Sequence, residues 1–215
     1  MQVHIWSDVV CPWCYIGKRR FERALEALAH RDQVEVTHRS FQLDPTRSRG
    51  ETSSRRSMLM SKYRRAAAEV LQMDEKMEAL AAAEGLEYHL TDANLTGNTL
   101  DAHQLVQLAK THGLQDAMLE RLYRAYFTEQ RSLFDRESLV NLAGETGLDT
   151  DNARQALEDG RFADAVAKDL HDARQLGVTG VPFFVVDGRY AVSGAQPAEV
   201  FTQILTRAWE ERAQA

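Results

Sequence analysis

The chain has 215 residues, of which 44% are hydrophobic and 27% charged, and its formal net charge is -6 at pH 7. This composition is that of a globular protein with enough chain for a substantial core. The negative charge argues against a nucleic-acid partner, because phosphate binding depends on clustered Lys and Arg. The sequence has no apolar run of roughly 18 residues and no recognisable signal peptide, so we expect a cytoplasmic protein without a membrane contact.

The first predicted elements form a β-α-β unit. Residues 3–7 alternate apolar and polar side chains, as a short strand does. The helix that follows places its apolar residues at the spacing of one helical face: Phe21, Ala24, Leu25 and Leu28. Residues 34–41 alternate again and predict a second strand.

Residues 44–177 have helical patterns throughout. The candidate core stripes are Ala102, Leu105, Val106 and Ala109, then Leu119, Leu122, Tyr123 and Tyr126, then Ala163, Val166, Ala167 and Leu170. Glycines stand where a helix end takes a left-handed residue: Gly85, Gly113, Gly147, Gly160 and Gly177. We therefore expect an all-helical insertion over residues 44–177.

Strand patterns return at residues 181–186 and 189–192, joined by Asp187-Gly188, a pair favoured in two-residue hairpin turns. A last helix carries apolar residues on one face: Phe201, Ile204, Leu205 and Ala208. The element order is therefore β-α-β, helical block, β-β-α.

The chain has only two cysteines, Cys11 and Cys14, which are separated by Pro12 and Trp13. Because structural disulfides are rare in the cytoplasm, such a C-x-x-C pair is better explained as catalytic or metal-binding. A structural zinc site needs four ligands, and no second C-x-x-C or C-x-x-H motif is present. The histidines that would have to complete it are isolated: His4, His30 and His38. We favour a catalytic dithiol and predict no metal.

The predicted helix start gives each cysteine a role. A thiol attacks a disulfide as the thiolate, and the unpaired N–H groups of a helix N-terminus favour an anion. Cys11 is therefore the expected nucleophile, and Cys14, within the first turn, the residue that resolves the mixed disulfide. Pro12 presets a helical φ at the first helical position. Trp13 adds an aromatic side chain beside the sulfurs, as a packing residue or as a substrate contact.

Two motifs frame the helical block: Cys11-Pro12-Trp13-Cys14 and Gly180-Val181-Pro182-Phe183-Phe184. Together they resemble the DsbA family of thioredoxin-fold proteins, and more narrowly its cytoplasmic FrnE-type branch. Further matching stretches are Asp8, Ser40-Phe41-Gln42-Leu43, Asn98-Thr99, Ala102-His103, Tyr126-Phe127-Thr128-Glu129 and Ser193-Gly194-Ala195-Gln196. The resemblance implies an α/β protein of thioredoxin-like fold with a large all-helical, DsbA-like insertion. Residues 1–43 and 178–215 would form the thioredoxin-like domain and residues 44–177 the insertion.

The sequence departs from the family pattern in two places. The pattern has glycine where this chain has Arg64, and a second cysteine pair found in some relatives is absent. Redox chemistry is therefore confined to one pair of cysteines.

The resemblance also implies site residues beyond the cysteines. The Val181–Pro182 peptide bond would be cis and lie across from the cysteines, where the backbone of Val181 pairs with an extended substrate. Pro182 also fits the first position of an ordinary strand. Asp8 would lie below the cysteine pair and accept or relay the proton of Cys14. It would equally serve a turn by hydrogen-bonding backbone N–H groups.

Ser193, Gly194 and Ala195 precede the last helix. In relatives that use glutathione, the corresponding turn holds the γ-glutamyl carboxylate, which backbone N–H groups at a helix start can bind. The same residues also form an ordinary turn with a helix cap. Glutathione is thus a candidate redox partner, and we expect no tightly bound cofactor.

Three functions compete. The leading hypothesis is a thiol–disulfide oxidoreductase that acts on protein disulfides, as an isomerase or a weak oxidant. The alternative is a glutathione-dependent small-molecule isomerase or transferase of the 2-hydroxychromene-2-carboxylate isomerase or kappa-class type, whose members usually have serine in place of Cys11. The third is a holdase or scaffold that uses the apolar rim around Trp13 and Val181. The basic segment Arg47 to Arg65 is either a solvated loop or a docking surface, and the oligomeric state stays open.

Overall fold

The computed structural model describes residues 1–212 and divides into two compact units. Among these residues, the first unit holds Met1–Phe41 and residues 169–212, and the second holds Gln42–Lys168. The sequence predicts that the two folding domains meet at residues 43/44 and 177/178, and these boundaries stay a prediction. Within residues 1–212, no helix is long and apolar enough to cross a membrane.

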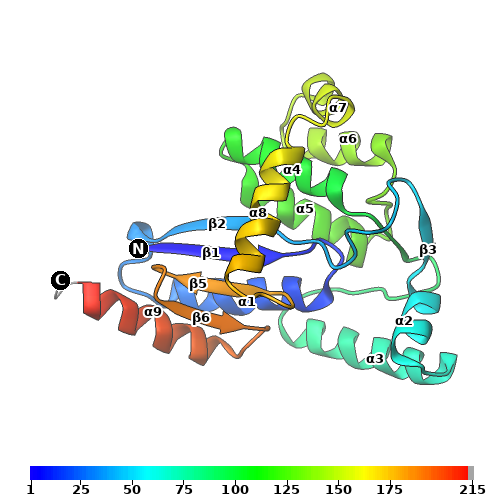
Figure 1. The fold of residues 1–215 in the computed structure, drawn as a ribbon. Helices are drawn as coiled ribbons and strands as arrows, with labels where there is room; N and C mark the ends of the chain where they lie inside the picture. The colour runs from blue at the N-terminus through cyan, green and yellow to red at the C-terminus, as the bar shows by residue number, and fades with distance from the viewer. Residues whose placement is uncertain (213–215) are drawn as a thin grey trace. The chain divides into compact units, whose positions relative to one another are not determined.

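The first unit is built on a four-stranded sheet in the order β2-β1-β5-β6 (Figure 1). The strand β1 (Gln2–Ser7) runs parallel to β2 (Glu35–Ser40) and antiparallel to β5 (Phe183–Val186). The strand β6 (Tyr190–Ser193) completes the sheet beside β5. The turn between them has positive φ at both Asp187 (52°) and Gly188 (67°), as a type I′ hairpin requires.

Two helices cover one face of this sheet, α1 (Pro12–Glu26) and α9 (Ala198–Arg212). Alternate residues of β1 point into this layer, because successive strand side chains face opposite sides. Three aromatic rings form its centre, with centroid distances of 5.6 Å for Phe21–Phe184, 5.8 Å for Phe21–Phe201 and 4.6 Å for Phe184–Phe201. This packing fixes α1, and with it the cysteine pair at its start, against the sheet.

The other face of the sheet carries a second, smaller cluster. Trp6 of β1 and Val185 of β5 pack there with Ala173 and Val178. Ala173 belongs to α8 (Ala163–Gln175), and Val178 follows it. Ala173 and Val178 therefore anchor this part of the chain to the sheet.

The second unit consists mainly of helices: α2 (Arg55–Tyr63), α3 (Ala67–Ala83), α4 (Leu100–Thr111), α5 (Gln115–Phe127), α6 (Arg136–Glu145), α7 (Thr150–Glu158) and the first part of α8. The predicted stripes of α4 and α5 are buried. The predicted stripe of α8 is partly wrong, because Ala167 is exposed and the buried positions are Val166, Asp169 and Ala173. A buried aspartate interrupts the apolar pattern, which is why periodicity alone misplaced the stripe.

The second unit also holds a two-stranded antiparallel sheet, which the sequence pattern did not indicate. It pairs β3 (Thr52–Ser54) with β4 (Leu95–Gly97). Three-residue strands made largely of Thr and Ser lack the apolar alternation by which strands are recognised.

The end of α2 shows why glycine suits the position that Arg64 occupies in this chain. Arg64 caps this helix with φ 52°, in the left-handed region. Glycine adopts this conformation without steric cost, whereas a residue with a Cβ is strained there. The glycine of the family pattern is the less strained residue for this cap.

Candidate active site

The cysteine pair lies at the start of α1, as the sequence predicts. Cys11 is the N-cap residue with extended backbone, Pro12 is the first residue of the helix, and the Cys14 amide donates to the Cys11 carbonyl at 3.0 Å. Cys11 is 5% exposed and Cys14 is 2% exposed, and both are free thiols. Cys11 thus lies beside the helix N-terminus, with Cys14 one turn behind it.

The surroundings of Cys14 keep its thiol protonated. Burial raises the pKa of Cys14 well above its ordinary value, and the hydrogen bond and charge of Cys11 raise it further. The nearby Asp8 carboxylate also raises the pKa, whereas a backbone hydrogen bond from Asp8 lowers it. Before Cys14 can attack, a base must therefore take its proton. Asp8 is 1% exposed, and its charge acts on the Cys14 thiol.

The late proline loop reaches the nucleophile. The Val181–Pro182 peptide bond is cis, and the Cys11 thiol donates to the Val181 carbonyl oxygen across 3.6 Å. This contact brings together residues 170 positions apart in the sequence. Val181 thereby presents its backbone beside the Cys11 sulfur.

The turn Ser193–Ala195 lies next to the proline loop. The Gly194 amide donates to the Pro182 carbonyl at 2.8 Å, and the Gln196 side chain closes the turn by donating to the Ser193 carbonyl at 2.9 Å. Both roles considered for this turn, ligand binding and helix capping, stay predictions.

Trp13 is 41% exposed, although it stands between two buried cysteines. Its ring is therefore accessible beside the nucleophile. This exposure favours the substrate contact over the packing role.

A buried carboxylate fastens the segment that leads into the proline loop. Asp169 of α8 accepts from the Arg39 guanidinium at 3.1 Å and from the Ser40 amide at 2.9 Å, while its backbone carbonyl accepts from Trp6 Nε1 at 3.0 Å. The cluster around Trp6 also includes Val181 as a partly buried member. Asp169 thus ties α8 to β1 and β2.

Sequence reasoning missed three residues that shape this site: Gly17, Arg20 and Asp169. Gly17 carried a signal, because an isolated glycine inside a helical pattern usually has a packing reason. Arg20 and Asp169 carried none, since their partners Ala195 and Arg39 lie 175 and 130 residues away in the sequence.

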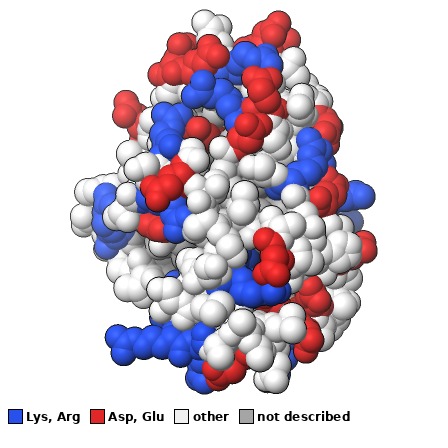
Figure 2. Space-filling view, turned by 90° about the vertical axis from the view of Figure 1, so that its right-hand side faces the viewer, with Lys and Arg blue, Asp and Glu red and all other residues white. Residues whose placement is uncertain are grey.

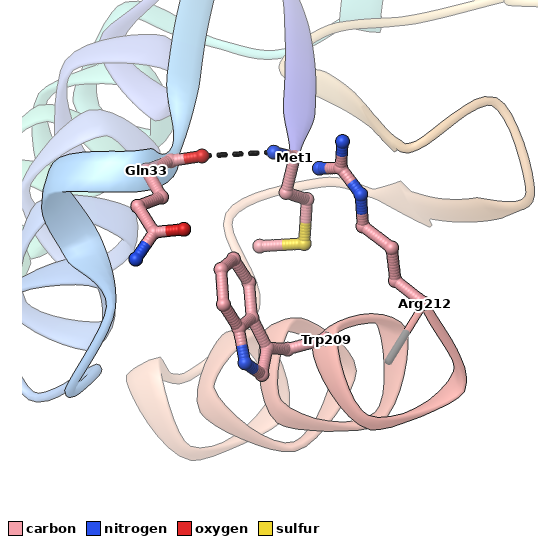
Figure 3. A pocket seen from close by; sticks show the side chains of 4 residues that line it. All are labelled: Met1, Gln33, Trp209 and Arg212. Carbon is pink, nitrogen blue, oxygen red and sulfur yellow. Dashed lines mark hydrogen bonds between the residues drawn. The ribbon is translucent and has the colours of Figure 1, made fainter. Parts of the chain in front are cut away.

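No group of three or more His, Cys, Asp or Glu side chains within residues 1–212 is arranged to hold a metal ion. A cavity of about 290 Å³ is lined by Met1, Gln33, Trp209 and Arg212 (Figure 3). In it the Met1 nitrogen donates to the Gln33 carbonyl at 2.8 Å, and no predicted site residue lines it. The cavity lies apart from the cysteine chemistry.

The basic segment Arg47 to Arg65 is largely neutralised within the second unit. Five of its seven basic residues form ion pairs: Arg47 with Asp44, Arg49 with Asp101, Arg55 with Asp74, Arg56 with Asp92 and Arg65 with Glu69. On the face that Figure 2 shows, basic and acidic side chains are intermixed. These pairings favour a structural role for the segment over a docking surface.

Known proteins resemble this chain along almost its whole length. The model of the DSBA-like thioredoxin domain matches residues 2–206. A probable DsbA oxidoreductase from Streptomyces coelicolor is 51% identical, with a TM-score of 0.95 over 98% of this chain and 91% of that chain. The uncharacterized protein YwbO from Bacillus subtilis (strain 168) is 29% identical over 213 residues, 96% of this chain and 97% of YwbO.

More distant solved structures share the fold. The cytosolic disulfide reductase DsbM from Pseudomonas aeruginosa with GSH is 18% identical, with a TM-score of 0.66 over 96% of this chain and 98% of that chain. A 2-hydroxychromene-2-carboxylate isomerase is 16% identical, with a TM-score of 0.72 over 100% of this chain and 98% of that chain. The thioredoxin-like fold with a helical insertion is thereby confirmed.

Proposed function

The chain belongs to the family of DSBA-like thioredoxin domains, and on that premise we propose that it is a thiol–disulfide oxidoreductase acting on protein disulfides, as an oxidase or isomerase. One observation carries the proposal: the Cys11 thiol stands at the start of α1 against the Val181 carbonyl, with the protonated Cys14 buried one turn behind. A nucleophile, a resolving thiol and a backbone edge for an extended chain are thus in one place.

In the reducing direction, the Cys11 thiolate attacks one sulfur of a substrate disulfide. The substrate S–S bond breaks, one substrate sulfur joins Cys11, and the other leaves as a thiolate that takes a proton from solvent. Cys14 then passes its proton to Asp8 and attacks Cys11. The substrate leaves as a second thiol, and the Cys11–Cys14 disulfide remains.

In the oxidising direction, a substrate thiolate attacks Cys11 of that disulfide, and Cys14 leaves as a thiolate that takes a proton from Asp8. A second substrate thiolate then displaces Cys11, so the substrate is oxidised and the protein reduced. Isomerisation begins as in the reducing direction. The substrate thiolate freed by Cys11 attacks another disulfide of the same substrate, and the thiolate released there then displaces Cys11 from the mixed disulfide. Reduction and oxidation use both cysteines, whereas isomerisation needs only Cys11, and the reduction potential decides which outcome prevails.

Protein thiols and glutathione are the partners that we propose. The structure of DsbM with GSH supports testing glutathione as the small thiol that exchanges with Cys11. The turn Ser193–Ala195, which the Gly194 amide joins to the proline loop, is the candidate site for its carboxylate. We place the reaction in the cytoplasm and the chain in the FrnE-type branch, on the motifs that it shares with that branch.

The test is refolding of a small model protein whose disulfides have been scrambled, in a glutathione buffer. We expect the wild-type protein to accelerate the recovery of native disulfides and Cys11→Ser to abolish this activity. Cys14→Ser should retain part of the isomerisation and accumulate a mixed disulfide visible by mass. If Cys11→Ser is as active as wild type, the proposal is wrong.

The same variants test the alternative of a glutathione-dependent small-molecule isomerase. The fold shared with the 2-hydroxychromene-2-carboxylate isomerase is what keeps this alternative in view. Full turnover of such a substrate by Cys11→Ser would favour it, because that chemistry needs a hydroxyl or thiol at this position but no disulfide.

A further inference from the structure

Every third residue at the start of α1 contributes to the site. Cys11, Cys14, Gly17 and Arg20 are spaced by three along the helix and its N-cap. Residues at this spacing form one of the ridges along a helix surface. The two cysteines are thus continued by a glycine and an arginine, neither of which has a role in the exchange chemistry described above.

Gly17 lets the proline loop lie against the backbone of α1. A Cβ at this position would stand 2.8 Å from Pro182 Cγ and 3.4 Å from Ala195 Cβ. Real Cβ atoms do not approach other carbons as closely as 2.8 Å. The absent side chain therefore gives Pro182 and Ala195 the space that they occupy.

Arg20 fastens the neighbouring turn to the same helix. Its Nη1 donates to the Ala195 carbonyl at 2.7 Å, in a partly buried position. A hydrogen bond from the Gly194 amide to the Pro182 carbonyl, at 2.8 Å, joins this turn to the proline loop. Because Val181 precedes Pro182 directly, a continuous path of short contacts leads from the Arg20 guanidinium to the Val181 carbonyl at Cys11.

We propose that Arg20 is a positioning residue for disulfide exchange, which holds the backbone of Val181 where an extended substrate pairs beside Cys11. The inference rests on the proposed function and adds that Arg20 influences the affinity for the substrate. A hydrogen bond from a charged donor is stronger than a neutral one, so its loss frees the turn and the loop to move from α1. The cysteine chemistry itself does not involve the guanidinium.

The inference predicts a particular kinetic change. Pairing with the backbone of Val181 binds a peptide equally in the ground state and in the transition state, so weakening it raises KM and leaves kcat unchanged. A small disulfide without a peptide backbone gains nothing from this pairing, so its kcat/KM stays unchanged. A residue that merely stabilises the fold would change neither parameter at a temperature where the protein is folded.

The experiment compares wild type with Arg20→Met, Arg20→Lys and Arg19→Met. Each protein reduces a disulfide-linked peptide and 2-hydroxyethyl disulfide, with dithiothreitol regenerating the dithiol. Arg19→Met is the matched control, because the neighbouring Arg19 bonds to Glu22 and Tyr15 of its own helix. Thermal unfolding of each variant confirms that the assay temperature lies below the transition.

We expect Arg20→Met to raise KM for the peptide about tenfold with kcat within twofold of wild type, while kcat/KM for the small disulfide stays within twofold. Arg20→Lys should recover part of the loss, because the ammonium group keeps a charged donor. A KM for Arg20→Met equal to that of Arg19→Met would overturn the inference, as would an equal loss on both substrates. If the wild-type protein reduces neither substrate, the proposed function itself fails.

Discussion

The substitution Gly17→Ala sets two opposing effects against each other. Alanine is preferred over glycine in a helix interior by about 1 kcal/mol. The added methyl group would stand 2.8 Å from Pro182 Cγ, so the proline loop must move outward by several tenths of an ångström. Overpacking of this kind costs about 1–3 kcal/mol. Because the contact is a proline ring in a packed loop, we expect overpacking to outweigh the helix preference. The free energy of unfolding should then fall by about 1 kcal/mol.

Activity should fall more than stability, because the displaced loop carries Val181 away from Cys11. We expect a roughly tenfold loss of kcat/KM with a peptide disulfide, in line with the cost of misplacing groups by a fraction of an ångström. Urea unfolding at constant pH measures the stability, and peptide reduction measures the activity.

The matched control for this substitution is Gly144→Ala in α6. Its added methyl group would meet only the Thr150 Cγ2 methyl at 2.8 Å, and that side chain can rotate. We expect it to leave activity unchanged and stability unchanged or up to about 1 kcal/mol higher. A Gly17→Ala variant that gains stability and keeps full activity would refute the reasoning about the loop.

Three further substitutions test other features. Asp169→Asn should lower the unfolding free energy by about 2 kcal/mol in urea titration, because Arg39 loses its largely buried counter-charge; an unchanged midpoint would contradict the role given to this pair. Arg64→Gly should raise the unfolding free energy by about 0.5–1 kcal/mol by relieving the left-handed strain. A lower unfolding free energy than that of wild type would show that the arginine stabilises this cap. The raised pKa of Cys14 stabilises the reduced protein fully below the unfolded thiol pKa, and this stability is lost as pH rises through the folded pKa. Urea unfolding under reductant should therefore show the reduced wild type losing stability above about pH 9 relative to Cys14→Ala, whereas parallel pH profiles would refute the assigned direction.

The sequence predicts the sheet and the placement of the cysteines because both depend on local patterns. Alternation marks the strand around Trp6, a short apolar run marks the strand around Phe184, and the helical period after Cys11 places it at a helix start. The hairpin turn at Asp187 and Gly188 follows from residue chemistry alone. In each case the cause lies within a few residues of the effect.

Other features depend on contacts between distant segments, which no local pattern reports. The burial of Asp169 is determined by Arg39 and Ser40, on a strand far earlier in the chain. The role of Arg20 follows from a carbonyl in the last turn before α9. The short sheet of the second unit depends on pairing between segments more than 40 residues apart, with little apolar content to mark them.

The central claim is that Cys11 and Cys14 form a reversible redox pair. Its most direct test equilibrates the protein with defined ratios of reduced and oxidised glutathione, followed by alkylation and mass measurement of the intramolecular disulfide. We predict one reversible transition with a potential between about −270 and −120 mV, where a value above about −200 mV indicates oxidase or isomerase work. If no Cys11–Cys14 disulfide forms at any ratio, the dithiol mechanism is contradicted.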